Sequence, residues 1–521
     1  MKPSSPRIDV DLAELDQIID EGMRAPLSET NGQKLKTALH ALVERVAPHW
    51  RTTEKTRAVL ERPPSAESGP EKSPPASDKP APAGHGRNHA ARFPGAHRVV
   101  IAHPTLRHGD LCPECGVGKV YRQKQPKTLV RIVGRPPLEA TRYEMERLRC
   151  NGCNQIFTAE TPPEAGPDKY DATAVAMIAQ LRYGSGVPFK RLERLEGNLG
   201  IPLPAATQWG LVEKEAERIR PAYDELIRQA AQGEVVHNDD TGMRILHLAR
   251  EPAPGKGERT GVFTSGIVSK VGVWLIALFF SGWKHAGENL ADVLRRRTPG
   301  LGPLIQMCDA LSRNAPKLSE GVRLLLANCL AHGRRQFVEV AANFPAECRY
   351  VLETLGSVWR HDELARKRNL SPEERLRFHQ EHSEPLMKTL KAWLEAQLAE
   401  HKTEPNSGLG KAIQYMLRHW EPLTLFLREA GAPLDNNLVE RALKKALLHR
   451  KNSLFYKTMK GAEVGDLFMS LIHTCELNGA NPFDYLTDLL RHAEELKQHP
   501  SEWMPWNYRD TLARLATPAA A

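Results

Sequence analysis

Three acidic residues stand at positions where they could bind divalent metal ions together. Asp239 and Asp240 are neighbours in the segment VHNDDTGMRIL, which has the composition of a β-strand. Asp309 ends the apolar segment PLIQMCD, and Glu440 lies in a strongly helix-forming run. Carboxylate oxygens are hard ligands that suit Mg²⁺ or Mn²⁺. Two such ions about 3.5–4 Å apart can activate a water or a hydroxyl and stabilise the leaving oxygen of a phosphodiester. The acids therefore indicate metal-dependent chemistry at phosphate.

The two neighbouring aspartates cannot both serve such a site. Successive side chains of a strand point to opposite faces, so only one of them shares the face of His237. The residues leave open which one this site uses, because a register shift of one would put Asp240 in the place of Asp239. Glu440 also has an alternative, an ion pair with Lys444 one helical turn away.

The elements that must position these acids follow one another from residue 234. Strands are expected near 234–246, 260–270, 271–281, 303–309 and 323–329, and helices near 285–298, 310–320 and 331–343. This order predicts a mixed α/β sheet whose first three strands form a meander. Acids on the first strand, at the end of the fourth and on a later helix are the arrangement by which a ribonuclease H-like fold builds a two-metal site. In that fold the first and fourth strands lie side by side.

Four cysteines have the spacing of a structural zinc site. CPEC (Cys112, Cys115) and CNGC (Cys150, Cys153) are two C-x2-C pairs separated by 34 residues, which suits tetrahedral coordination by four thiolates. The alternative is four unrelated thiols. Eight cysteines in 521 residues do not make a disulfide scaffold, and no secretory signal opens the chain. We therefore expect a reducing, cytoplasmic setting.

A helical region before the first strand resembles a helix-turn-helix. A short helix to Leu195 is followed by a turn and by a second helix from about Pro204. The first helix carries three basic residues that could contact phosphates, namely Lys190, Arg191 and Arg194. Thr207 and Gln208 could reach base edges. The alternative is an ordinary pair of packed helices.

Composition and charge complete the domain plan. The net charge of +9 is compatible with a polyanionic partner or simply with solubility. The longest apolar run, VGVWLIALFF, is too short to span a bilayer. Residues 61–92 contain no Val, Ile, Leu or Phe and cannot bury a core. The expected parts are an N-terminal helical segment (1–60), a disordered linker (61–104), a zinc ribbon (105–160), the helix-turn-helix-like region (161–232), the first part of the α/β core (233–344), a helical insertion (345–430), the last core helix with C-terminal helices (431–495) and a tail (496–521).

Five segments in a fixed order resemble the IS66 family of bacterial insertion-sequence transposases. They are VHNDDTG, MCDALSRN, CLAHGRRQF (329–337), DNNLVERALKKALLHRKNSLF (435–455) and LNGANPFDYL (477–486), and the resemblance covers roughly residues 105–495. The family motif Asp-Glu-Thr-Pro stands here as Asp239-Asp240-Thr241-Gly242. The resemblance therefore implies a DDE transposase with Asp239, Asp309 and Glu440 as its acids. Cys329 and His332 resemble a C-x2-H signature found after the second acid, and we expect a structural role for them because two zinc ligands are lacking.

The resemblance also implies a reaction and partners. A phosphodiester at the element end is hydrolysed, and the exposed 3′-hydroxyl is joined to target DNA with Mg²⁺ or Mn²⁺ in the catalytic site and structural Zn²⁺ elsewhere. DNA, a homo-oligomer on DNA and accessory proteins of the same element are the expected partners, in the bacterial cytoplasm at the nucleoid and not at a membrane. Basic residues near the second and third acids could hold the DNA backbone: Arg334, Arg335, Arg441, Lys444, Lys445, Arg450 and Lys451. The alternatives are a transposase-derived DNA-binding protein without catalytic activity, and a zinc-ribbon adaptor, which would leave the acids unexplained.

Overall fold

The computed structural model describes residues 96, 98–123, 128–133, 135–151, 153–248, 261–318 and 321–516. The expected N-terminal helical segment and most of the expected linker lie outside these residues. The described chain forms two units. The larger comprises Gly166–Leu192 and the chain from Pro204 onward, and the smaller comprises the residues up to Ala165 together with Glu193–Leu203.

The smaller unit contains two cysteine turns and one hairpin. Strands β1 (Arg147–Arg149) and β2 (Ile156–Thr158) pair antiparallel. The N–H of Gly116 donates to the carbonyl of Cys112 at 2.8 Å, and that of Asn154 to the carbonyl of Cys150 at 3.0 Å. Gly116 and Asn154 both have positive φ, 66° and 62°, as such tight turns require. Each C-x2-C pair thus spans its own turn.

The centre of the larger unit is a five-stranded mixed sheet. Its strands are β3 (Val235–Gly242), β4 (Phe263–Val271), β5 (Trp274–Gly282), β6 (Leu304–Cys308) and β7 (Leu324–Asn328), in the spatial order β5-β4-β3-β6-β7. β3, β4 and β5 form an antiparallel meander, whereas β6 runs parallel to β3 and β7 parallel to β6. The predicted strands and the meander are therefore confirmed.

Helices α7 (Ala286–Leu294) and α14 (Asn437–Ser453) cover opposite faces of this sheet. On β4, the Ser265 hydroxyl accepts a hydrogen bond from Asn289 of α7 at 2.8 Å. The next residue, Gly266, faces α14, because a Cβ there would lie 2.9 Å from a methyl carbon of Leu443 and 3.1 Å from one of Val439. Neighbouring residues of a strand point to opposite faces, so the two helices lie on opposite sides. Gly266 lets α14 approach the sheet closely.

Helix α15 (Met459–Leu477) covers the outer edge of β5 with a ladder of polar side chains. The side chains of Asp466, Ser470, Thr474 and Asn478 accept from the backbone N–H of Ser281, Phe279, Ala277 and Leu275 at 2.6, 2.9, 3.1 and 3.1 Å. Every fourth residue of the helix thus pairs with every second residue of the strand. Four helical residues rise about 6 Å and two strand residues about 6.6 Å, so the two spacings match along the whole edge. The ladder satisfies backbone donors that an open edge strand would expose.

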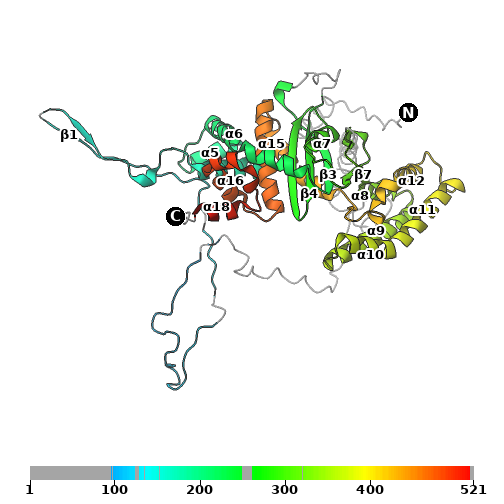
Figure 1. The fold of residues 1–521 in the computed structure, drawn as a ribbon, viewed down its shortest axis with the longest axis horizontal. Helices are drawn as coiled ribbons and strands as arrows, with labels where there is room; N and C mark the ends of the chain where they lie inside the picture. The colour runs from blue at the N-terminus through cyan, green and yellow to red at the C-terminus, as the bar shows by residue number, and fades with distance from the viewer. Residues whose placement is uncertain are drawn as a thin grey trace, which may run out of the picture. The chain divides into compact units, whose positions relative to one another are not determined.

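The remaining helices complete the larger unit and the region before the sheet. Before the sheet lie α4 (Ala172–Ala179), a π-helix (Gln180–Gly184), α5 (Phe189–Asn198) and α6 (Ala205–Ala230). The predicted helical insertion is α9 (Pro345–Lys367), α10 (Pro372–His382), α11 (Glu384–Ala399), α12 (Gly408–Arg418) and α13 (Trp420–Leu423), entered through α8 (Leu330–Val340). The chain ends in α16 (Pro482–Arg491), α17 (Ala493–Gln498) and α18 (Tyr508–Ala516). The insertion forms a helical bundle, coloured yellow-green to yellow in Figure 1, and shares one hydrophobic core with β6 and β7. None of the described helices is long and apolar enough to cross a membrane.

Two predictions of local structure are wrong. The helix expected near 310–320 is only a 3-10 turn, η6 (Ser312–Asn314). Ala315 is extended because it precedes Pro316, and the residue before a proline disfavours helical dihedrals. Gln208 was expected to reach base edges, but it is fully buried and donates to the carbonyl of Phe189 at 3.1 Å. It sits in the first turn of the 26-residue helix α6, where it holds two helices together.

Replacing Gly266 with valine should loosen α14 from the sheet. The added carbons would overlap Leu443 and Val439, and overpacking of this kind costs about 1–3 kcal/mol of unfolding free energy. Gly210 of α6 has nothing within 4 Å of its missing Cβ, so Gly210→Ala is the matched control. That change should be neutral or stabilise the helix by about 0.5–1 kcal/mol. Urea denaturation measures both; a Gly266→Val protein that unfolds at the wild-type midpoint would contradict the close approach of α14.

Candidate catalytic and metal-binding site

Asp239 and Asp309 lie level with each other on neighbouring parallel strands. The register of β3 and β6 pairs Val235 with Ile305 and His237 with Met307. Each aspartate follows this last pair by two residues, Asp239 within β3 and Asp309 just after β6. Parallel strands advance together, so the two acids meet at the carboxyl end of the sheet. Both strands are buried up to the point where the acids occur, so the acids stand where each strand leaves the core.

The side-chain amide of Asn314 joins the two carboxylates. Its Nδ2 donates to Oδ1 of Asp309 and, at 3.4 Å, to Oδ1 of Asp239. Asn314 is fully buried, and its backbone carbonyl accepts from Asn238 at 2.8 Å and from Gln306 at 2.7 Å. Asn314 was not among the predicted site residues, although it ends the MCDALSRN segment. Only the path of η6 brings it back over β6.

The electrostatics of this pair favour a bound cation. Burial, and then the charge of Asp309, raise the pKa of Asp239 to about 6. The hydrogen bonds from Asn314 and from the Asp240 N–H, the latter at 2.8 Å, oppose that rise without cancelling it. Two carboxylates in partial burial that share one neutral amide donor repel each other. A divalent cation between them would remove the repulsion, so the donor set fits Mg²⁺ or Mn²⁺.

Asp240 points to the opposite face of the sheet. Its Oδ2 lies 2.7 Å from Nδ1 of His285 and accepts from the N–H of Ala286 at 3.3 Å, both at the start of α7. Its Oδ1 lies 3.5 Å from Arg313, and only 1% of the side chain is exposed. Asp240 therefore anchors α7 and η6, and η6 in turn carries Asn314. The structure gives the two neighbouring aspartates different partners.

Glu440 lies on the same side of the sheet as Asp239. His237 shares the Asp239 face of β3, and its Nδ1 is 3.1 Å from Oδ1 of Asn436, which precedes α14. Glu440 follows one turn later, and its Oε1 is 4.0 Å from Nδ1 of His332 on α8. Among the described residues, no direct contact joins Glu440 to either aspartate. Glu440 therefore lies near His332, and not in the ion pair with Lys444 that was the alternative.

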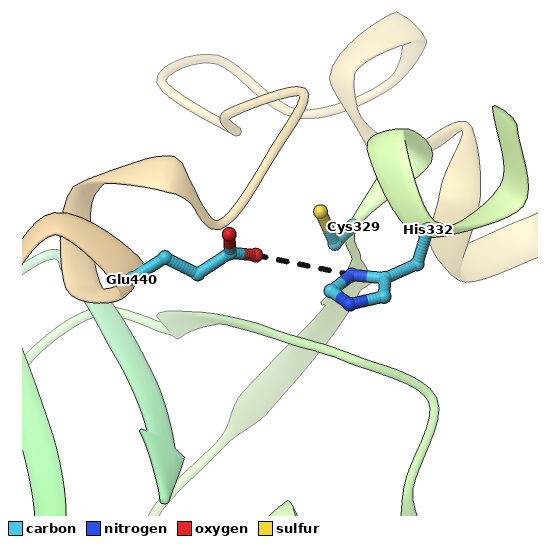
Figure 2. Close-up of side chains that lie close together, drawn as sticks. All are labelled: Cys329, His332 and Glu440. Atoms are coloured by element: carbon cyan, nitrogen blue, oxygen red, sulfur yellow. Dashed lines mark ion pairs between the residues drawn. The ribbon is translucent and has the colours of Figure 1, made fainter. Parts of the chain in front are cut away.

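Cys329 completes a cluster with His332 and Glu440, shown in Figure 2. The ligand atoms of these three residues lie within 4.8 Å of one another. Cys329 is fully buried, and its Sγ accepts from the backbone N–H of Asn436 at 3.2 Å. Burial raises the pKa of this thiol to about 11. The C-x2-H pair at the start of α8 is thus brought to the acid at the start of α14, which the sequence spacing did not predict.

The predicted basic residues differ in how far their side chains are exposed. Arg441, Lys444 and Lys451 are exposed and form one stripe of α14, which also carries Leu448 with 41% exposure. Lys445 forms an ion pair with Glu476 at 2.8 Å, and Arg450 donates to the Thr241 hydroxyl at 3.4 Å and to the Gly242 carbonyl. On the other predicted helices, Arg335, Lys190, Arg191 and Arg194 are exposed and Arg334 is half-buried. We call Arg441, Lys444 and Lys451 the α14 stripe.

The four cysteines of the predicted zinc ribbon are reduced and at least partly exposed. The N–H of Gly118 donates to Sγ of Cys115 at 3.4 Å, so the backbone of the turn helps to position this sulfur. The hydrogen bonds of this turn lower the pKa of the Cys115 thiol. Within the described ranges, the structure does not gather three or more of these sulfurs at one point. Zinc at Cys112, Cys115, Cys150 and Cys153 therefore stays a prediction.

Comparison with known proteins identifies the family. Residues 169–464 match the sequence model described as the transposase IS66 family, and residues 470–506 match the IS66 C-terminal element. Among curated proteins, the chain is similar to two uncharacterised proteins of Sinorhizobium fredii (strain NBRC 101917 / NGR234). It is 28% identical to y4hP over 81% of this chain and 77% of that protein, and 28% identical to y4jD over 71% and 73%. These matches show that the chain belongs to the family of IS66 transposases.

Replacing Asp239 with asparagine should stabilise the metal-free protein above about pH 6. The folded-state pKa of about 6 lies above the ordinary value of 3.8, so between these values the folded protein keeps a proton that the unfolded chain has released. Wild-type stability therefore falls as the pH rises through this window. Asparagine does not ionise, so the variant does not lose this stability. Its unfolding free energy relative to wild type should rise from near zero at pH 4 to about 1–2 kcal/mol above pH 6.

Thermal unfolding in magnesium-free buffer from pH 4 to 8 measures this gain. Asp240→Asn is the matched control, because it removes the partner of His285, Arg313 and the α7 N-terminus and should destabilise by about 1–3 kcal/mol. Equal melting temperatures of wild type and Asp239→Asn at pH 7.5 would show that the acid pair is not strained.

Proposed function

We propose that this IS66 family member is a catalytically active DDE transposase. It binds the ends of an insertion sequence, hydrolyses a phosphodiester there and joins the exposed 3′-hydroxyl to target DNA. Asp239, Asp309 and Glu440 are its catalytic acids. The observation that carries the proposal is the pair of level, mutually repelling carboxylates on β3 and β6, joined by Asn314. DNA binding alone would not require two buried carboxylates that repel each other.

The order of the sheet supports a ribonuclease H-like core. An antiparallel meander (β3, β4, β5) is followed by two parallel strands, with β6 placed beside β3. This arrangement puts the acid of the first strand next to the acid after the fourth strand, as the sequence predicted. α14 brings Glu440 to the same side of the sheet as Asp239.

The chain's own residues prepare the acids for metal binding. Among the described residues, the hydrogen bonds to the carboxylates of Asp239 and Asp309 all fall on Oδ1, from Asn314, from the Asp240 N–H and from the Leu311 N–H. The Oδ2 atoms of both aspartates are therefore left for ligation. Mg²⁺ or Mn²⁺ bound there would activate a water or 3′-hydroxyl and stabilise the leaving oxygen. Asn314 holds both carboxylates in register, and Asp240 holds the segment that carries Asn314.

DNA contacts are proposed on three surfaces. The α14 stripe lies on the helix that bears Glu440, where cations can hold phosphates beside the reacting one. The cysteine turns, with structural Zn²⁺, and the exposed basic residues of α5 would recognise element ends. Pairing of two ends requires a dimer or larger assembly on DNA, and accessory proteins of the same element are further candidate partners.

A cleavage assay tests the proposed activity. Purified protein with labelled DNA from the gene's own flanks and Mg²⁺ or Mn²⁺ should give metal-dependent nicks at a fixed end. Asp309→Ala should lower the rate by at least about a hundredfold, because it removes a metal ligand. Asp292→Ala is the control, since this acid of α7 pairs with Lys284 and Arg295 on the surface. Tight binding without cleavage by any of the proteins would favour a transposase-derived DNA-binding protein.

Removing the α14 stripe should change the salt dependence of DNA binding. Each phosphate contact contributes about 0.9 to the slope of log K against log salt, so Arg441→Ala, Lys444→Ala and Lys451→Ala together should reduce the slope by about 2–3. The control removes the same charge from the insertion, at Lys367, Lys388 and Lys402, each of which pairs with a neighbouring glutamate. Fluorescence anisotropy from 50 to 300 mM salt gives the slopes. A stripe variant whose slope equals that of the control would place the DNA elsewhere.

A further inference from the structure

A thiol, an imidazole and a carboxylate converge where the helical insertion leaves and rejoins the α/β core. We propose that Cys329, His332 and Glu440 bind a divalent zinc ion, at a site separate from the aspartate pair. The ligand atoms lie within 4.8 Å of one another, and Figure 2 shows Glu440 and His332 pointing toward each other with Cys329 beside them. This binding does not depend on the proposed DNA chemistry.

The backbone holds the three ligands in place without the ion. The N–H of Cys329 donates to the carbonyl of Cys308 at 2.9 Å, which fixes the start of α8 to the end of β6. The N–H of Leu330 donates to the carbonyl of Leu434 at 2.9 Å, and the N–H of Asn436 donates to the Cys329 sulfur at 3.2 Å. The starts of α8 and α14 are therefore joined directly. Little conformational freedom remains to be lost when the ligands close on an ion.

One ligand atom lacks a partner. Nδ1 of His332 is buried and has no hydrogen-bond partner, because Oε1 of Glu440 lies at 4.0 Å, beyond hydrogen-bond range. Buried polar atoms without a partner are rare, and a metal ion bound at this nitrogen would satisfy it. Tetrahedral zinc with ligands at about 2.0–2.3 Å sets them about 3.3–3.8 Å apart. The His332 and Glu440 side chains are 30% and 36% exposed, so both can make the movement of about 1 Å that this requires.

The ligand types select the ion. A thiolate and an imidazole favour zinc over magnesium, which takes oxygen ligands only. Three protein ligands leave a fourth position for water, as in zinc sites that are not purely structural. Glu440 would supply one carboxylate oxygen to the zinc. Zinc would thus set the position of the third acid.

The ion would lie where the helical insertion joins the α/β core, so it should stabilise the fold. α8 leads into the insertion and α14 follows its return, so the ion would close a loop of about 100 residues at its base. An ion that binds only when these ligands are brought together stabilises the folded state by its binding free energy. Zinc should therefore raise the melting temperature of the protein as well as fix Glu440.

Zinc content of the full chain tests the proposal. After dialysis against zinc-free buffer, mass spectrometry of metals should find one zinc fewer per chain in His332→Ala than in wild type. The readout is the difference in zinc content between wild type and His332→Ala, which does not depend on whether the four-cysteine turns bind a second zinc. The double variant Cys112→Ser, Cys115→Ser measures zinc at those turns separately. His419→Ala is the matched control, because His419 is also partly exposed and packs on Tyr415 outside the cluster. It should keep the wild-type zinc content.

A second measurement identifies the ligands. Cobalt added to the metal-free protein should give a thiolate charge-transfer band that is weaker in Cys329→Ser, and Glu440→Gln should weaken cobalt binding. Zinc should raise the melting temperature of wild type and of His419→Ala more than that of His332→Ala. Equal zinc content in His332→Ala and His419→Ala, or displacement of this zinc by magnesium alone, would overturn the proposal. Neither result would affect the test of cleavage.

Discussion

The parallel pairing of β3 with β6 is the constraint on which the rest of the site depends. It sets Asp239 and Asp309 level at the end of two buried strands. The alternation of side chains along β3 then separates the two neighbouring aspartates completely. Asp239 faces the side that α14 covers, and Asp240 faces α7, where His285 and Arg313 hold it. A single strand thus supplies both a candidate ligand and the anchor for the elements around it.

The acid pair is electrostatically unfavourable without a cation, and the surrounding structure offsets this. Burial and the neighbouring charge raise the pKa of Asp239, while Asn314 is held under the pair by Asn238 and Gln306. The sheet itself is completed on its far edge by the side-chain ladder of α15, which satisfies the backbone donors of β5. The electrostatic cost of the acid pair therefore lies at one end of a sheet whose β5 edge is satisfied. This is the usual relation between a functional site and its scaffold.

Glu440 connects the α/β core to the helical insertion. Its helix is preceded by Asn436, which hydrogen-bonds both His237 of β3 and the sulfur of Cys329. The third acid is therefore placed by contacts to the sheet on one side and to the start of the insertion on the other. The starts of α8 and α14 are joined by direct hydrogen bonds, so the insertion and the third acid share one point of attachment to the core.

The sequence by itself determined the elements and the kinds of residue at their ends. Strand patterns, the acids after apolar runs, the paired cysteines and the family motifs are all local, since burial of one face imposes a period within each element. The tertiary structure alone decided which residues meet. It turned the predicted helix at 310–320 into a short turn, brought Asn314 to Asp239 and Asp309, and buried Gln208. It also placed Glu440 beside His332, a residue more than 100 positions earlier. Such contacts depend on strand register and helix packing, which no local period encodes.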